Sequence, residues 1–338
     1  MWGIFRSCGT KVPYPLVRPY DHTPGVRQRF LALVVGLASL GLEACDGKKT
    51  VLLIADAGHA RIVQVDDLSG AGWRTFAVPL DNPNVIGPWG LAVDSKGRIY
   101  ATAVGDDRVF RIDDIAGGGY VSFGRSGAGI GEFAGPSGLA VDDQDRLYVA
   151  DAENSRIVRM DAIDGSGWTT LGSMGSGVGQ FNEAIDIALD KQQRLYVADR
   201  QNGRLVRVND MTGAGWLSYG QKRNGVHPGS FDLLGGVAVA TDGRIYATDS
   251  NENIVIGIDD MTGAGYGSFG YVDGNSRFKQ PTGIAVDDAS PIYVASENNG
   301  LVYSFQDMDG TGLMTLGSAG ADRTLNRPLD IVVARVPN

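Results

Sequence analysis

Two aspartates, Asp186 and Asp330, have the residue type and the placement to bind a cation. Each begins a short apolar run at a position where four similar runs have glycine: Gly90, Gly138, Gly236 and Gly283. Ca²⁺ takes six to eight oxygen ligands, so two facing carboxylates would begin a Ca²⁺ site. The alternative is structural, because aspartate at a turn commonly accepts hydrogen bonds from backbone N–H groups. Asp186 and Asp330 are therefore candidate metal ligands, with Ca²⁺ as the one cofactor that the sequence suggests but does not require.

Other residues beside these runs complete a candidate ligand-binding face: Trp89, Ser137, Arg200 and Thr282. Arg200 could bind an anion or form a surface ion pair. His59 is the candidate general base, and an exposed loop residue is the alternative for both His59 and His227. A zinc site with three histidines is excluded, since the chain has only three and one lies in the N-terminal segment.

One acidic position recurs, which favours a structural role for its residues. Four strand-like segments end in aspartate just before a turn: Asp56, Asp151, Asp199 and Asp249. A catalytic carboxylate is needed once rather than four times, whereas aspartate at turns accepts backbone N–H bonds. We interpret these four residues as turn-forming.

The elements that must position all these residues are six repeats. Equivalent apolar anchors are separated by 47, 48, 48, 50 and 47 residues: Leu53, Tyr100, Tyr148, Tyr196, Tyr246 and Tyr293. Each repeat holds four short runs with strand composition, which in the third repeat are 138–142, 146–151, 156–161 and 168–172. Four antiparallel strands in such a period are typical of a propeller blade. The fold class predicted is all-β, a six-bladed β-propeller.

The repeats resemble the NHL repeat family in three blocks of the third copy, which are Pro136 to Asp142, Tyr148 to Asp151 and Asn154 to Ile157. The resemblance covers residues 51–336 and implies a propeller whose ligand face combines the loops entering strand one with the turns between strands two and three. The first repeat lacks its innermost strand, and the chain end from Pro328 has the spacing to supply it. We expect this C-terminal strand to complete blade one and close the ring. Blades one and four are opposite each other in a six-fold ring, so we expect Asp330 and Asp186 to face each other across the channel mouth, on the side of the entry loops.

The N-terminal 44 residues differ from the repeats. Arg27 and Arg29 precede an uncharged run, Phe30 to Leu42, which is too short to span a bilayer as a helix. This pattern is typical of a secretory signal at residues 26–44, and the residues before Cys45 resemble a bacterial lipobox. We predict lipidation at Cys45, a linker over 45–50, and a membrane-anchored lipoprotein facing the periplasm or cell exterior. Residues 1–25 do not fit a signal, and we interpret them as an over-extended start before Val26.

Charge and repeat architecture limit the function classes. The chain has 30 basic and 39 acidic residues. Residues 1–44 hold five of the basic and two of the acidic residues, so the rest of the chain has 25 basic and 37 acidic residues and a formal charge of −12. Such a charge argues against nucleic-acid binding. Two hypotheses remain. The first is a monomeric, non-catalytic scaffold whose loop face binds a protein or small molecule. The second is a metal-dependent hydrolase or lyase of the gluconolactonase-like type, to which related propellers belong.

Overall fold

The structure, a computed structural model, describes residues 2–7, 10–15, 48–81, 87–223, 225–272, 275–288, 290–317 and 323–337. Thr50–Pro337 forms one compact unit. Strands β1 (Trp2–Ser7) and β2 (Thr10–Pro15) pair as an antiparallel hairpin that belongs to a separate unit. The predicted signal at 26–44 and the candidate lipidation site Cys45 lie outside the described residues. No helix within the described ranges is long and apolar enough to cross a membrane.

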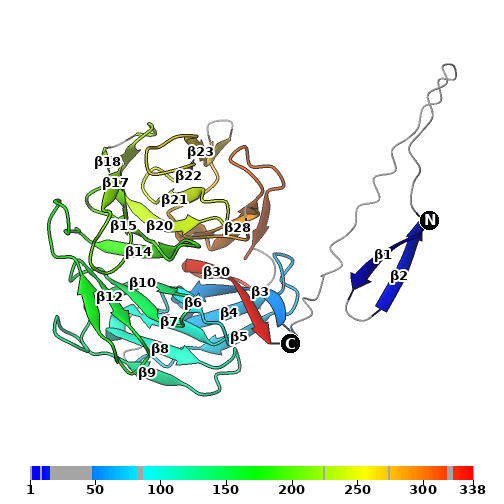
Figure 1. The fold of residues 1–338 in the computed structure, drawn as a ribbon, viewed down its shortest axis with the longest axis horizontal. Coiled ribbons are helices and arrows are strands. Elements are labelled where there is room, and N and C mark those ends of the chain that lie inside the picture. Colours follow the sequence, from blue (N-terminus) through cyan, green and yellow to red (C-terminus); the bar gives the residue numbers. More distant parts are fainter. Residues whose placement is uncertain are drawn as a thin grey trace. The chain divides into compact units, whose positions relative to one another are not determined.

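The compact unit is a ring of six four-stranded sheets around a central channel, which confirms the predicted propeller (Figure 1). From the inner to the outer edge, blade one consists of β30 (Pro328–Pro337), β3 (Lys48–Asp56), β4 (Arg61–Val65) and β5 (Arg74–Ala77). Blade two consists of β6 (Leu91–Val93), β7 (Ile99–Ala103), β8 (Arg108–Ile112) and β9 (Val121–Phe123). Blade three consists of β10 (Pro136–Val141), β11 (Leu147–Asp151), β12 (Arg156–Met160) and β13 (Thr169–Leu171).

The remaining blades repeat this order. Blade four consists of β14 (Ala184–Leu189), β15 (Leu195–Asp199), β16 (Arg204–Val208) and β17 (Leu217–Tyr219). Blade five consists of β20 (Leu234–Val239), β21 (Ile245–Asp249), β22 (Ile254–Ile258) and β23 (Gly267–Phe269). Blade six consists of β26 (Pro281–Val286), β27 (Ile292–Ser296), β28 (Leu301–Phe305) and β29 (Met314–Leu316).

Short elements occupy the connections. Two small ladders join β18 (Gln221–Lys222) to β19 (Ser230–Phe231) and β24 (Tyr271–Val272) to β25 (Asn275–Ser276). Single 3₁₀ turns follow the second strand in three blades: η1 (Ala57–His59), η2 (Val104–Asp106) and η3 (Glu297–Asn299).

The hydrophobic core lies between neighbouring blades. Strand side chains alternate between the two faces of a blade, so each blade offers one apolar set to each neighbour. One cluster, for example, joins Tyr100 and Val109 of blade two to Leu139 and Val149 of blade three. Each blade therefore needs its two neighbours to bury its apolar surface, and only a closed ring leaves none unpaired.

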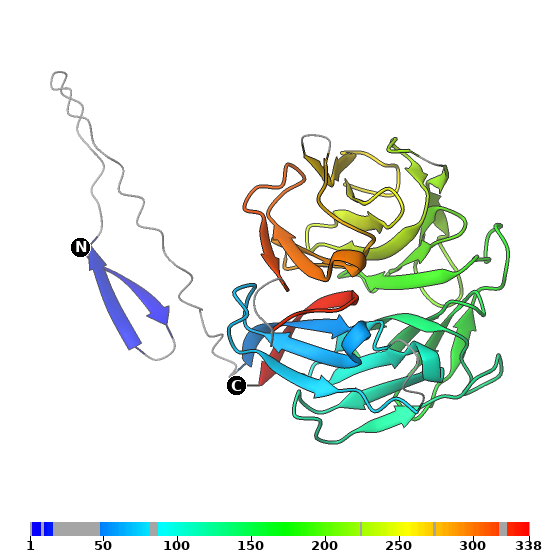
Figure 2. The ribbon, with the colours of Figure 1, turned by 180° about the vertical axis from the view of Figure 1, so that it is seen from behind.

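The C-terminal strand closes the ring, as the sequence predicted. β30 forms the inner edge of blade one beside β3, so the two ends of the propeller meet in one sheet (Figure 2). Leu329 and Ile331 of β30 are fully buried, and Ile331 packs in a cluster with Leu52 and Ile54 of β3. Closure removes the exposed sheet edge that an open array of repeats would leave.

Candidate functional site

A closed belt of six hydrogen bonds links each blade to the next around the channel. Pairing of the inner strands shifts register near their start, as in blade three between Pro136 and Leu139. Such a bulge leaves backbone groups that the ladder does not use. Side chains of neighbouring blades bond these groups: Leu91 N to Asp330 Oδ2 (2.8 Å), Thr102 Oγ1 to Ser137 O (2.7 Å), Ser137 Oγ to Ile185 O (2.7 Å), Val237 N to Asp186 Oδ2 (2.8 Å), Thr248 Oγ1 to Thr282 O (2.5 Å) and Thr282 Oγ1 to Pro328 O (3.4 Å).

The belt repeats every three blades. In blades one and four, an aspartate accepts a hydrogen bond from a backbone N–H of the next blade. In blades two and five, a threonine of the second strand donates to a backbone carbonyl of the next blade. In blades three and six, a serine or threonine of the inner strand does the same. The belt therefore accounts for four of the six residues predicted to form the ligand-binding face: Ser137, Asp186, Thr282 and Asp330. Sequence reasoning missed Thr102 and Thr248, although both replace an alanine found at the same position of the other four repeats.

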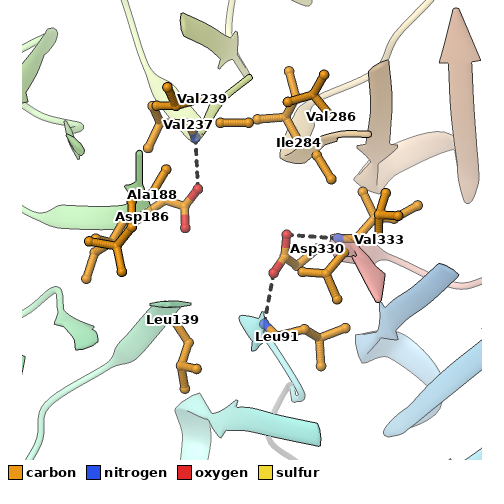
Figure 3. Close-up of a pocket in the computed structure, with 16 residues that line it drawn as sticks. Leu91, Leu139, Asp186, Ala188, Val237, Val239, Ile284, Val286, Asp330 and Val333 are labelled. Atoms are coloured by element: carbon orange, nitrogen blue, oxygen red, sulfur yellow. Dashed lines mark hydrogen bonds between the residues drawn. The ribbon is translucent and has the colours of Figure 1, made fainter. Parts of the chain in front are cut away.

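Asp186 and Asp330 line one cavity in the channel, of about 220 Å³. Figure 3 shows both carboxylates directed into the space between the inner strands. Burial raises the pKa of Asp186 to about 7. Burial, together with repulsion from Asp186, raises the pKa of Asp330 well above its ordinary value. Two interacting carboxylates in such a place hold protons at a pH where exposed aspartates are ionised.

Residues at the two ends of the channel differ in burial. At equivalent positions toward the end away from the entry loops, the inner strands carry half-buried aliphatic residues: Val93, Val141, Leu189, Val239, Val286 and Val333. Residues at the entry end, such as Ser137 and Ile185, are buried. Trp89 of blade two packs against the hydrophobic cluster that contains Ile185 and Leu234 of blades four and five, so its side chain must extend over the entry end.

This arrangement corrects one expectation. We predicted that Asp186 and Asp330 face each other at the channel mouth on the side of the entry loops. The structure places them inside the channel, and the cavity that they line runs to Leu189, Val239 and Val333 at the opposite end. The physical reason is the packing of large residues at the entry end, above all Trp89. Trp89 therefore covers the entry end and does not line the cavity.

The recurring aspartates are structural, as predicted. Asp151 accepts a bond from Ala134 N of the entry loop (2.7 Å) and another from Arg156 Nε (2.7 Å). Asp199 repeats this with Asn182 N and Arg204 Nε, both at 2.7 Å. Entry loops and strand two–three turns therefore share one face of the ring, which the family resemblance implied.

His59 and Arg200 are engaged within this same face. His59 Nδ1 lies 2.9 Å from Asp56 Oδ2, in the turn after β3, and His59 does not line the channel cavity. Arg200 Nη1 lies 3.7 Å from Glu183 Oε1, an ion pair between a turn and an entry loop of one blade. The structure therefore does not bring His59, the candidate base, together with Asp186 and Asp330.

Exposed aliphatic residues recur on the entry loops, which sequence reasoning missed. Ile130, Val178 and Val226 occupy equivalent positions 48 residues apart, in the loops entering blades three, four and five. Their exposed fractions are 80%, 78% and 38%, and that of Met174 in the second loop is 68%. We call these four residues the entry-loop crest. The signal available in the sequence was the 48-residue spacing of these aliphatic residues within glycine-rich loops.

Two half-buried arginines fix the first two of these loops. Arg156 donates to three carbonyl groups of the loop before it, those of Ala128, Gly129 and Glu132. Its side chain is only 13% exposed and stays paired with Asp151. Arg204 makes the same contacts to Ser176, Gly177 and Gln180. The crest residues of blades three and four are thus held outward on rigid loops.

Blade five uses a different set of contacts for the same purpose. Ile254 replaces the arginine, and Glu252 Oε1 accepts from Gly225 N (2.6 Å) while Ser230 Oγ donates to Gly225 O (2.9 Å). Exposed His227 belongs to this loop.

Across the described residues, no group of three or more histidine, cysteine, aspartate or glutamate side chains is placed to hold a metal ion. Binding of Ca²⁺ by Asp186 and Asp330 stays a prediction.

Comparison with known proteins confirms the NHL resemblance and the fold. Residues 133–160, which span three strands of blade three, match the NHL repeat. No curated protein matches the chain. A solved structure of a nidogen/laminin complex is similar, with 15% identity over 84% of this chain and 98% of that chain and a TM-score of 0.66. A virginiamycin B lyase from Staphylococcus aureus gives 13% identity over 80% of this chain and 81% of that chain, with a TM-score of 0.54. At such identities the likeness shows the fold alone.

Proposed function

We propose that this NHL-repeat propeller is a non-catalytic binding module that docks a partner protein through the entry-loop crest. The observation that carries the proposal is the recurrence of an exposed aliphatic residue at one loop position in three consecutive blades. Single exposed apolar residues are ordinary on protein surfaces, but a repeated set on one face is typical of interaction sites.

Rigidity of the loops favours binding over incidental exposure. Arg156 and Arg204 each fix three carbonyl groups of the loops that carry Ile130 and Val178. A side chain held in its bound position loses little conformational entropy on docking, which strengthens binding. A few apolar anchors of this kind commonly supply most of the affinity of an interface.

Charge and likeness favour a protein as the partner. The formal charge of −9 opposes association with nucleic acid or with an anionic lipid surface. The nidogen/laminin complex contains a similar propeller within an assembly of proteins. The enzyme hypothesis receives less support, because His59 and the two channel aspartates occupy different places.

Site-specific photo-crosslinking tests the docking surface. A photoreactive amino acid in place of Val178, in the full chain made in its native cells, should give a discrete protein adduct. Ile130→Asp on the neighbouring loop should abolish this adduct, because a charge at an apolar anchor must be desolvated on docking. Met314→Asp is the matched control, since Met314 is 54% exposed but lies on outer strand β29. Adducts that survive Ile130→Asp, or their absence from every crest position, would exclude docking here.

We also propose that the crest is presented at the cell envelope, by a chain that is exported and held by a lipid on Cys45. The support is the basic flank, short apolar run and lipobox-like residues before Cys45. Palmitate label incorporated into the protein should disappear in Cys45→Ala, whereas a label that persists in this variant would exclude the anchor.

A further inference from the structure

Two neighbouring loops of the propeller carry four exposed basic side chains. Lys222 and Arg223 belong to the loop that enters blade five, and Arg277 and Lys279 belong to the loop that enters blade six. Lys222 Nζ donates to Gln201 Oε1 (3.0 Å), and no described carboxylate forms an ion pair with any of the four. We call Lys222, Arg223, Arg277 and Lys279 the basic patch, and the face of the ring that carries the entry loops the entry face.

Other arginines of the entry face already have an acidic partner within the protein. Those that pair with a carboxylate are Arg61, Arg108, Arg125, Arg156, Arg200, Arg204 and Arg327. A paired cation gains less from a carboxylate on a second protein, because the internal pair must be shared or broken. The basic patch therefore keeps cationic groups available for a partner.

The basic patch is continuous with the entry-loop crest. Val226 of the crest lies in the same loop as Lys222 and Arg223. The turn between strands two and three of blade five joins this loop to the next one, because Glu252 Oε1 accepts from Gly225 N (2.6 Å) and Asn253 Oδ1 accepts from Gln280 N (2.8 Å). A partner that covers Val226 therefore also covers part of the basic patch.

The two loops are basic although the protein is acidic. Residues 220–232 and 270–280 each hold two basic residues and one aspartate, so each loop has a formal charge of +1, whereas the chain has −9. Asp232 of the first loop is buried and accepts a hydrogen bond from Asn251 Nδ2. Asp273 of the second loop lies outside the described residues. The exposed charge of the described part of both loops is therefore positive.

The opposite face of the ring has the reverse charge. Strand three runs away from the entry face, so the turns between strands three and four lie on the other side. These six turns hold no lysine or arginine, and their aspartates are Asp66, Asp67, Asp113, Asp114, Asp161, Asp164, Asp210, Asp259, Asp260, Asp307 and Asp309. Such a polarised protein repels an anionic partner from one face and attracts it to the other.

We propose that the protein docked on the entry-loop crest is acidic next to its apolar contact, and that its carboxylates meet the basic patch. This inference rests on the docking function proposed above and specifies the chemistry of the partner. The crest supplies the apolar anchors, and the patch supplies charge complementarity at the rim, which favours one orientation and speeds association.

Association kinetics of the protein captured through Val178 test this proposal with the full chain. Lys222→Glu/Arg223→Glu should lower kon about tenfold at low salt, because the charge that steers the partner is reversed. The difference should disappear at 1 M salt, where the Debye length is about 3 Å. Ile130→Ala should instead raise koff, because it removes an apolar contact without adding a charge.

A matched control separates the basic patch from net charge. Lys96→Glu/Lys191→Glu makes the same change in net charge at exposed turns on the opposite face, and should change kon less than twofold. Thermal unfolding of both double variants establishes that they are folded. An equal loss of kon in the two double variants would overturn the proposal. So would an unchanged kon in Lys222→Glu/Arg223→Glu while Ile130→Ala still raises koff, a result that leaves the docking function standing.

A fluorescent octaglutamate peptide tests the basic patch without the captured protein. It should bind the full-length protein at low salt, bind at least fivefold more weakly to Lys222→Glu/Arg223→Glu, and bind equally well to Ile130→Ala. Absence of octaglutamate binding would overturn the proposal, whereas binding of octaglutamate without any crosslinked protein would contradict the docking function alone. Tighter binding of octauridylate, lost in the same double variant, would overturn the proposal in favour of a nucleic acid.

Discussion

A chain that ends before Pro328 is expected to lose the cooperative unfolding of the whole propeller. The deletion removes β30, and with it the inner strand of blade one and the fully buried Leu329 and Ile331. It also removes the carboxylate that accepts from Leu91 N of blade two. The loss should be comparable to the total stability of a typical domain, about 5–15 kcal/mol.

Denaturant unfolding followed by tryptophan fluorescence and circular dichroism measures this effect. The matched control is deletion of residues 1–44, which lie outside the compact unit Thr50–Pro337 and should leave the unfolding curve unchanged. If the C-terminally truncated chain unfolds in one transition at the original midpoint, β30 does not close the ring.

Replacement of Asp186 by asparagine is expected to stabilise the propeller at pH 8 and to have a smaller stabilising effect at pH 5. Burial raises the folded-state pKa of Asp186 to about 7, above the ordinary value of an unfolded chain. Between these two values the folded state holds more protons than the unfolded state, so wild-type stability falls as pH rises through the folded pKa. The contribution is fully present only below the unfolded pKa.

Asparagine removes this dependence while its amide oxygen can still accept from Val237 N. One pKa unit corresponds to about 1.4 kcal/mol, and the water-accessible channel reduces the full effect, so we expect a gain of about 2 kcal/mol at pH 8. Asp186→Ala should instead destabilise the protein by about 1–3 kcal/mol, since Val237 N then loses its partner. Urea unfolding of the wild-type protein and of both variants at pH 5 and pH 8 measures these differences in the free energy of unfolding.

Asp309→Asn is the control, because the Asp309 side chain is exposed on a turn of blade six. A wild-type protein whose stability does not change between pH 5 and pH 8, or an Asp186→Asn variant that is less stable at pH 8, would contradict the burial of an uncompensated charge in the channel.

Local repeats made the fold predictable. The run predicted as strand 156–161 is β12, Arg156–Met160, and the run at 146–151 is β11, Leu147–Asp151. The period alone placed Asp330 in the inner column of blade one. Since a ring of six equal units puts blades one and four opposite each other, the spacing predicted that Asp186 and Asp330 face each other across the channel mouth. The structure places both in one cavity inside the channel.

The position of the cavity along the channel could not be predicted in the same way. It depends on whether large side chains fill the space where six strands converge, and Trp89 fills it from one blade only. The period fixes which residues are equivalent but not how far a side chain reaches across the axis.

To predict the belt and the entry-loop crest, one would have to compare the repeats at positions that carry no catalytic residue type. Thr102 and Thr248 are the hydroxyl donors of blades two and five, three repeats apart. Ile130 and Val178 lie in glycine-rich loops that carry no recognisable motif, whereas Arg156 and Arg204 hold those loops in place. Contacts between distant segments decide both features, and a single sequence does not display them.

The most direct test of the proposed docking function is the affinity of the crosslinked partner for variants of the crest. Ile130→Asp and Val178→Asp should each raise the Kd about tenfold or more, as expected for apolar anchors that must be desolvated. The double variant should bind still more weakly, while Met314→Asp should retain the wild-type Kd. An unchanged Kd for the double variant, with its thermal unfolding intact, would contradict binding through the entry-loop crest.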